Sequence, residues 1–351
     1  MKIFIQFSFL FLFFSQACIS QSFDVDDLLD LSRLPSKNLG KFMNRKGYVP
    51  MRQPEDPSVL ASFTPTRKRK NTDTVSQRSI DLFQKKSSRF YCFKTNVKQE
   101  FLDGLEALKK DRFIYDSSRD PNKDGLIMFQ KRNLVVEADR NTIDDKTYYS
   151  FTLEEKAIPD MRDIKYAEDL LCFGSHEFLA SFFGDINVKK DMYYFTENEL
   201  KKCSVLFGKS SRQVIFVWGN QQNLCDLSYI LVTKVAPTVE AVSQGWDVAK
   251  NEWKLSNGLY PGMSLKELLT LNESDFEIYG SQSEMAFMVK PDDRGKIDFK
   301  KTGVMLNCMG CNEENFFRKT SLSAAALLRN DFPVYVYDLV VFNSSLGDAI
   351  H

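Results

Sequence analysis

Two cysteines near the C-terminus, Cys308 and Cys311, have the spacing of a thiol–disulfide site. Residues 312–317 are compatible with the first turn of a helix, and a helix N-terminus lowers the pKa of a thiol and so favours disulfide exchange. However, the motif lacks the strand–helix–strand surroundings that its redox version requires. A zinc site would need two further ligands, and the other cysteines are scattered. The spacing therefore favours a local structural disulfide or two small core residues, with redox chemistry as the alternative.

A second pair, Cys203 and Cys225, falls on two segments that are expected to be adjacent strands. A bridge between them would stabilise the fold by about 3 kcal/mol, because it restricts the unfolded chain. The chain has seven cysteines, and the six other than Cys18 allow fifteen pairings. We therefore expect disulfides, without fixing every partner.

Other catalytic and metal-binding chemistry has little support in the sequence. The chain has only two histidines, His176 and His351, whereas nucleophilic triads and histidine-based zinc sites depend on imidazole groups. His176 is expected at the start of a helix, with a solvated side chain. Residues 120–125 have the ligand spacing that begins a calcium loop, but Lys131 replaces the bidentate carboxylate, so a hairpin turn is the better interpretation. We assign no catalytic residue, no metal ligand and no cofactor.

The charge balance argues against a nucleic-acid partner. Lys and Arg together number 47, as do Asp and Glu, and the two signs are interspersed along the chain. Such a chain has no net field that would attract a polyanion. No glycine-rich phosphate loop is present either.

A short phrase is repeated at residues 27–32, 169–174 and 267–272: an acid, two leucines, a free position, an apolar residue and a small or polar residue. Each copy predicts the start of a short helix, since the acid complements the helix dipole and the leucines anchor the helix on a sheet. Alternating apolar segments after these helices predict antiparallel strands. The fold class is therefore α+β, with short helices packed on antiparallel sheets in repeated helix-on-sheet modules.

The succession of helices followed by strands restarts near residue 160, which predicts two domains, at residues 21–160 and 161–351. Within the first, residues 50–80 are expected to be an exposed loop or linker, because prolines and a basic tetrad interrupt the periodicity. About 330 residues are enough for two hydrophobic cores.

The N-terminus predicts export. One lysine precedes an apolar run at residues 3–14, and small or polar residues follow, which is the layout of a signal peptide over residues 1–20. Alternatively, residues 15–18 form a loose lipobox that makes Cys18 the lipid-bearing first residue of a lipoprotein. No later stretch is long and apolar enough to cross a bilayer. We expect a periplasmic, outer-membrane-associated or extracellular protein, tethered at most by a lipid anchor.

Two parts of the chain resemble known families. Residues 246–275, with Trp253 and the run Gly-Leu-Tyr-Pro-Gly-Met-Ser-Leu, are similar to an uncharacterised family of exported bacterial envelope proteins. Residues 332–334 are similar too, whereas residues 280–287 lack the Trp and most of the glycines typical of that family. The N-terminal half resembles helix–turn–helix plus four-strand modules of the β-lactamase-inhibitor-protein and outer-membrane-assembly small-lipoprotein type. The second resemblance implies protein binding.

These observations favour a non-catalytic exported envelope protein that binds a protein or another envelope component through a sheet face. The alternative is an envelope thiol–disulfide oxidoreductase acting through Cys308 and Cys311. The sequence does not specify the partner.

Overall fold

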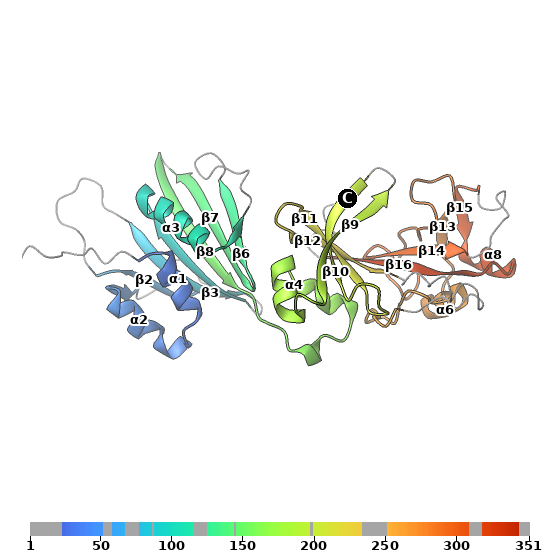
Figure 1. Cartoon of the computed structure of the whole chain (residues 1–351), viewed down its shortest axis with the longest axis horizontal. Helices are drawn as coiled ribbons and strands as arrows, with labels where there is room; N and C mark the ends of the chain where they lie inside the picture. Colours follow the sequence, from blue (N-terminus) through green and yellow to red (C-terminus); the bar gives the residue numbers. More distant parts are fainter. Residues whose placement is uncertain are drawn as a thin grey trace, which may run out of the picture. The chain divides into compact units, whose positions relative to one another are not determined.

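The computed structural model (Figure 1) describes residues 23–51, 58–66, 77–85, 88–115, 125–143, 145–196, 199–233, 251–308 and 318–343. The chain forms two compact units, Met1–Ala157 (unit 1) and Ile158–His351 (unit 2). Within the described residues, the strands form antiparallel sheets of eight, six and two strands, accompanied by short helices. The predicted α+β class with antiparallel sheets is therefore confirmed.

The sheet of unit 1 has the strand order β1-β2-β3-β4-β8-β7-β6-β5. Its strands are β1 (Tyr48–Pro50), β2 (Val59–Pro65), β3 (Arg78–Lys85), β4 (Ser88–Thr95), β5 (Ile114–Tyr115), β6 (Leu126–Lys131), β7 (Leu134–Ile143) and β8 (Lys146–Glu155). The helical segments are α1 (Val25–Ser32), η1 (Ser36–Asn38), α2 (Leu39–Arg45) and α3 (Lys98–Lys110). Figure 1 shows α1 and α3 on one face of this sheet, and both contact β4 and β8. We call this the inner face of unit 1, and the opposite one its outer face.

The core of unit 1 lies between the inner face and these helices. The predicted apolar face of α3 is confirmed, since Phe101, Leu105 and Leu108 are all buried. The ring of Phe101 lies 5.2 Å from that of Phe151 on β8, which is also buried. Because side chains alternate along a strand, the neighbours of the inward residues point to the outer face.

The expectation of an exposed loop or linker over residues 50–80 is wrong in part. Strand β2 lies inside this range, pairs with β1 and β3, and buries Ser62 and Phe63. Prolines interrupt the apolar pattern here. Pro65, however, lies at the last position of β2, where the missing backbone N–H removes no hydrogen bond from the middle of the sheet. Residues 52–57 and 67–76 lie outside the described residues.

The main sheet of unit 2 has the strand order β14-β16-β12-β11-β10-β9, and β13 and β15 form a separate pair. Its strands are β9 (Val188–Thr196), β10 (Glu199–Leu206), β11 (Val214–Asn220), β12 (Cys225–Thr233), β13 (Glu277–Tyr279), β14 (Thr302–Cys308), β15 (Ser321–Ser323) and β16 (Val334–Phe342). The helical segments are η2 (Met161–Asp163), η3 (Ala167–Cys172), α4 (His176–Phe183), α6 (Leu265–Asn272) and α8 (Ala324–Arg329). The largest apolar cluster joins one sheet face to α4, α6 and α8. A smaller cluster of strand residues lies on the other face: Cys203, Val205, Ile215, Val217 and Leu231.

All three copies of the repeated phrase start a helical segment. The acids Asp27, Asp169 and Glu267 each accept a hydrogen bond from the backbone N–H three residues earlier, at 3.3, 2.8 and 2.8 Å. This is the reciprocal half of a capping box, and it satisfies a donor that the helix itself leaves unpaired. The middle copy forms only η3, because the chain becomes extended at Phe173 before α4 begins at His176. The phrase therefore builds helix starts.

Candidate binding face

The outer face of unit 1 carries a row of polar side chains across five neighbouring strands. Ser62, Asp81, Cys92, Thr152 and Glu137 lie opposite one another, in that order, on β2, β3, β4, β8 and β7. The residues next to them along these strands point to the inner face and are buried in the core of unit 1. We call these five residues the polar row.

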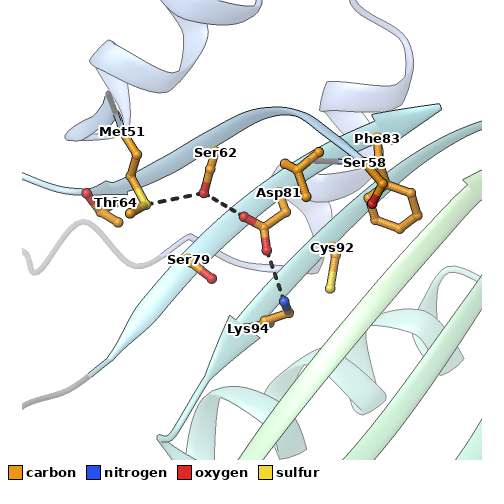
Figure 2. Close-up of a pocket in the computed structure, with 10 residues that line it drawn as sticks. Met51, Ser58, Ser62, Thr64, Ser79, Asp81, Phe83, Cys92 and Lys94 are labelled. Carbon is orange, nitrogen blue, oxygen red and sulfur yellow. Dashed lines mark hydrogen bonds and ion pairs between the residues drawn. The ribbon is translucent and has the colours of Figure 1, made fainter. Parts of the chain in front are cut away.

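One end of the polar row borders a hollow of about 580 Å³ (Figure 2). Asp81 holds this region together, since Ser62 Oγ donates to its Oδ1 at 2.6 Å and Lys94 Nζ to its Oδ2 at 3.0 Å. Ser62 is only 5% exposed, whereas Lys94 is exposed. Both carboxylate oxygens are therefore engaged, and the amine of Lys94 brings a positive charge to the rim.

The same hydrogen bonds argue against chemistry in this hollow. The Ser62 hydroxyl donates its proton to a carboxylate, not to the imidazole of a nucleophile–base pair. Burial raises the pKa of the Cys92 thiol, although Thr152 donates to its sulfur at 3.4 Å and acts in the other direction. A thiol is nucleophilic as the thiolate, so Cys92 is held in its less reactive form. The arrangement suits recognition.

Carboxylates and aromatic rings also lie on the outer face. Burial, followed by the nearby carboxylates of Glu154 and Asp139, raises the pKa of Glu137. Phe83 and Phe90 stack with their ring centroids 5.0 Å apart. Aromatic side chains are enriched at protein–protein interfaces, where a polar rim surrounds them.

The expected disulfide between Cys203 and Cys225 is not formed. Cys203 is a buried free thiol on β10, while Cys225 begins β12, and β11 lies between these strands. Strands two positions apart in a sheet are separated by roughly 9–10 Å, which is beyond the reach of a disulfide. The two cysteines lie on strands that follow each other with β11 between them, both along the chain and in the sheet, so they are not on adjacent strands. Burial raises the pKa of Cys203 to about 12, with a further contribution from Asp191.

The other predicted cysteine site falls at the border of the described residues. Cys308 ends β14 and is disulfide-bonded. Cys311 lies outside the described residues, so the pairing of Cys308 with Cys311 stays a prediction. Cys18, the candidate lipidation site, and residues 120–124 of the calcium-like loop also lie outside them.

His176 forms a half-buried polar contact instead of a solvated one. Its Nδ1 lies 2.8 Å from Ser204 Oγ, which also accepts a hydrogen bond from Trp218 Nε1 at 2.9 Å. Burial, and then the charge of Lys190, lower the pKa of His176. Ser204 is fully buried, so a substrate cannot reach its hydroxyl, and the pair has a structural role.

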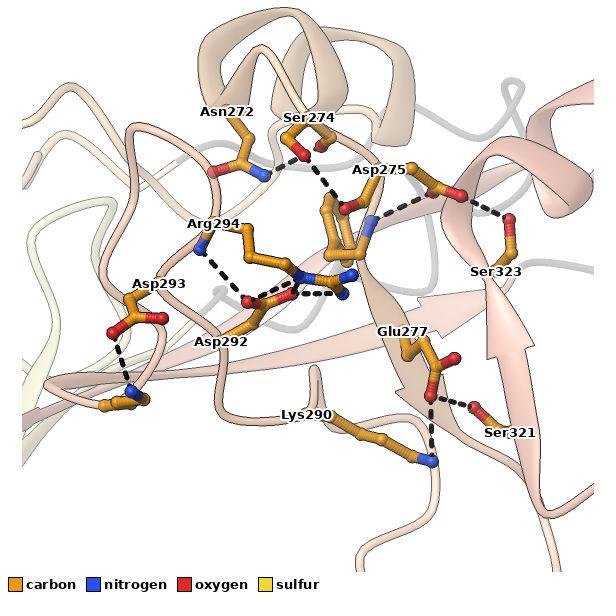
Figure 3. A network of polar contacts seen from close by, with 12 residues as sticks. Asn272, Ser274, Asp275, Glu277, Lys290, Asp292, Asp293, Arg294, Ser321 and Ser323 are labelled. Carbon is orange, nitrogen blue, oxygen red and sulfur yellow. Dashed lines mark hydrogen bonds and ion pairs between the residues drawn. The ribbon is translucent and has the colours of Figure 1, made fainter.

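A polar network surrounds the β13–β15 pair of unit 2 (Figure 3). Asp275 accepts side-chain and backbone hydrogen bonds at the start of α8. Glu277 accepts a bond from Lys290 Nζ at 3.2 Å. Arg294 binds Asp292 through two nitrogens and thereby lowers the pKa of Asp292 to about 2. Because each of these carboxylates has a partner, the network stabilises the β13–β15 pair and the start of α8. It offers no acid–base pair for catalysis.

Sequence reasoning missed the polar row, although a signal was present. β3, β4 and β8 alternate apolar residues with small or charged ones, as in residues 148–154. That alternation indicates a sheet with one non-core face. It does not give the register, which decides which of these side chains meet.

Comparison of the chain with protein-family models, with curated proteins and with solved structures gave no match. Across the described part of the chain, no three or more His, Cys, Asp or Glu side chains are grouped so that they could hold a metal ion. None of the helices described here is long and apolar enough to cross a membrane.

Proposed function

We propose that this is a non-catalytic exported protein that binds another protein through the outer face of unit 1. The observation that carries the proposal is the polar row with its adjacent hollow of about 580 Å³. The face combines buried and satisfied polar groups with a stacked aromatic pair and several carboxylates. Export itself is proposed from the predicted signal peptide at residues 1–20.

The charges of the outer face indicate the chemistry of the partner. Glu137, Glu154 and Asp139 cluster on β7 and β8, and Lys94 lies on β4. A like-charged neighbourhood is the reason that the pKa of Glu137 is raised beyond the effect of burial. A partner that brings basic side chains to this side of the face would relieve the repulsion.

Site-specific photocrosslinking in native envelopes tests the proposal. Benzoylphenylalanine is introduced at Glu137 on the outer face or, as a matched control, at the exposed Glu106 on α3. We expect a discrete crosslinked species from position 137 alone. The charge reversal Glu154→Lys should abolish it, because it removes one of the carboxylates that the partner contacts.

Two results would contradict the proposal. One is an equal crosslinking pattern from both positions, which would indicate collisions without a specific face. The other is insulin-reduction activity that disappears in Cys308→Ala, which would instead support the thiol–disulfide alternative.

A further inference from the structure

Three of the four edges of the two large sheets are short or covered. The edges of the unit 1 sheet, β1 and β5, have three and two residues. Strand β14 is covered by residues 287–289, since Leu306 N–H donates to Phe287 O and Val289 N–H to Val304 O, both at 2.9 Å. The fourth edge, β9, has nine residues and, in the part of the chain that the structure describes, pairs only with β10. Proteins usually shorten or cover such edges, because they invite pairing with another chain.

The backbone of β9 directs hydrogen-bonding groups outward at alternate residues. Met192 N–H donates to Asp191 Oδ1 at 2.8 Å instead of to β10. Opposite Met192, the N–H of Lys202 also turns away from β9 and donates to Gln221 Oε1 at 2.6 Å. This is a non-hydrogen-bonded pair of an antiparallel ladder. Met192 and the residues two positions before and after it therefore present their backbone groups to the open edge.

An exposed apolar patch lies on one face of this edge. Met192 is 52% exposed, Tyr194 66% and Leu200 40%. The register places Leu200 opposite Tyr194, and Lys202 opposite Met192, so these side chains share one face. Exposed Met and Tyr side chains beside a strand edge that no other strand covers are suited to contact a partner strand.

The other face of the same edge borders a hollow of about 620 Å³. Asp191 and Tyr193 of β9 line it, and the buried side chains of Cys203, Val205 and Ile215 form its apolar base. Its volume falls in the range of ligand pockets, roughly 300–1,000 Å³. A strand added to β9 would direct alternate side chains to the patch and to this hollow, which is how strand addition gains specificity.

The edge carries an excess of positive charge. Lys189, Lys190 and Lys202 are exposed, and Asp191 is the exposed acid among them. In the described part of the chain, neither Lys190 nor Lys202 has a carboxylate partner. A partner segment with acidic side chains would complement these amines and exclude basic competitors.

We propose that β9 is a docking edge for an extended segment of a partner protein, one that alternates acidic and apolar residues and adds to the sheet as a further strand. The backbone of β9 supplies the hydrogen bonds. Because side chains alternate along a strand, the apolar side chains of the segment lie on one face, over the hollow, and its acidic side chains lie on the other face, near Lys190 and Lys202. The lysines select for acidic residues. This edge belongs to unit 2 and the polar row to unit 1, so each proposal can fail while the other stands.

Binding of synthetic peptides to the full chain tests the docking edge. The probe is a labelled nine-residue peptide that alternates glutamate with valine or phenylalanine, and the control peptide has lysine in place of glutamate. We expect saturable binding of the acidic peptide alone in fluorescence anisotropy. In amide exchange, the peptide should protect Met192 N–H, which faces the edge.

Two variants at one position separate the contribution of the backbone N–H to binding from that of the side chain. Met192→Pro removes the outward N–H but leaves the β9–β10 ladder intact, because that N–H does not bond to β10. Met192→Ala shortens the side chain and keeps the N–H. We expect affinity to fall about tenfold or more in the first variant and only a few-fold in the second, with unchanged circular dichroism in both.

The outcomes decide the proposal. Equal binding of the lysine peptide, unchanged affinity in Met192→Pro, or no saturable binding of the acidic peptide would overturn it. A dimer of the native protein that Met192→Pro converts to a monomer would also overturn it, because the edge would then be occupied by a second copy of the chain.

Discussion

Replacing Gly104 with alanine should destabilise unit 1, although alanine is the better helix former. Gly104 lies in the middle of α3, on the side that packs against the sheet. A Cβ atom there would lie 2.6 Å from Phe151 Cζ and 2.8 Å from Val25 Cγ2. Both neighbours are fully buried, and Phe151 also packs against Phe101. Neither can move aside without disturbing the core.

The magnitude follows from two opposing effects. Glycine to alanine in a helix interior gains about 1 kcal/mol of helix propensity. Forcing a methyl group into a packed core costs about 1–3 kcal/mol. Contacts below 3 Å with two buried side chains place Gly104 at the upper end of that cost. We therefore expect the free energy of unfolding to fall by about 1–2 kcal/mol.

The matched control is Gly40→Ala in α2. Beyond its chain neighbours and the backbone of its own helix, a Cβ atom at Gly40 would have no atom within 4 Å, so only the propensity gain remains. The free energy of unfolding should then rise by about 0.5–1 kcal/mol. The same chemical change is thus predicted to have opposite signs in two helices of one unit.

Urea unfolding measures both variants. Far-UV circular dichroism follows the whole chain, and tryptophan emission reports unit 2, since Trp218, Trp246 and Trp253 all belong to it. The tryptophan transition should stay unchanged in both variants. A higher stability of Gly104→Ala, or shifts of the same sign in the two variants, would refute the packing of α3 against β8.

Three further predictions concern unit 2. Gly295→Ala should lower the free energy of unfolding by about 1–3 kcal/mol, because its Cβ would collide with the buried side chain of Asn272. In an Asn272→Ala background the same substitution should lower this free energy much less, which a double-mutant cycle measured by denaturant unfolding would show. Of the two histidine signals in a proton NMR titration, the one lost in His176→Gln should titrate below pH 6.5, because burial lowers its pKa. The folded state then binds this proton less readily than the unfolded chain, so stability should fall as the pH drops through 6.5 and stop falling below the folded pKa. Peptide mapping of the denatured, non-reduced protein should show Cys203 alkylated and no peptide that links it to Cys225.

Local signals in the sequence were enough to predict where helices begin. The acids at Asp27, Asp169 and Glu267 act on a backbone N–H three residues away, so no tertiary contact is needed to specify them. The apolar face of α3 likewise depends only on a spacing of three and four residues. Together with the alternating strand segments, these features predict the α+β class.

Features that depend on register or on edge position were missed. Strand β9 begins with Val188 and three charged residues, Lys189, Lys190 and Asp191, a composition that hides its strand character. Charged side chains are frequent on edge strands, so the lack of an apolar alternation is consistent with the edge position of β9. The polar row was not predicted for a related reason, since its members are brought together only by the pairing of five strands.

The contacts around the hydroxyl and thiol groups also explain why recognition is the better-supported role for the described residues. A nucleophile needs a base within reach and an open path to the substrate. Ser204 lies within hydrogen-bonding distance of an imidazole but is fully buried, whereas Ser62 borders a hollow but donates to a carboxylate. Burial raises the pKa of both Cys92 and Cys203, which disfavours the thiolate. Reactivity and access are thus separated in each case, while the exposed groups on the outer face and on β9 are those that we propose to contact a partner.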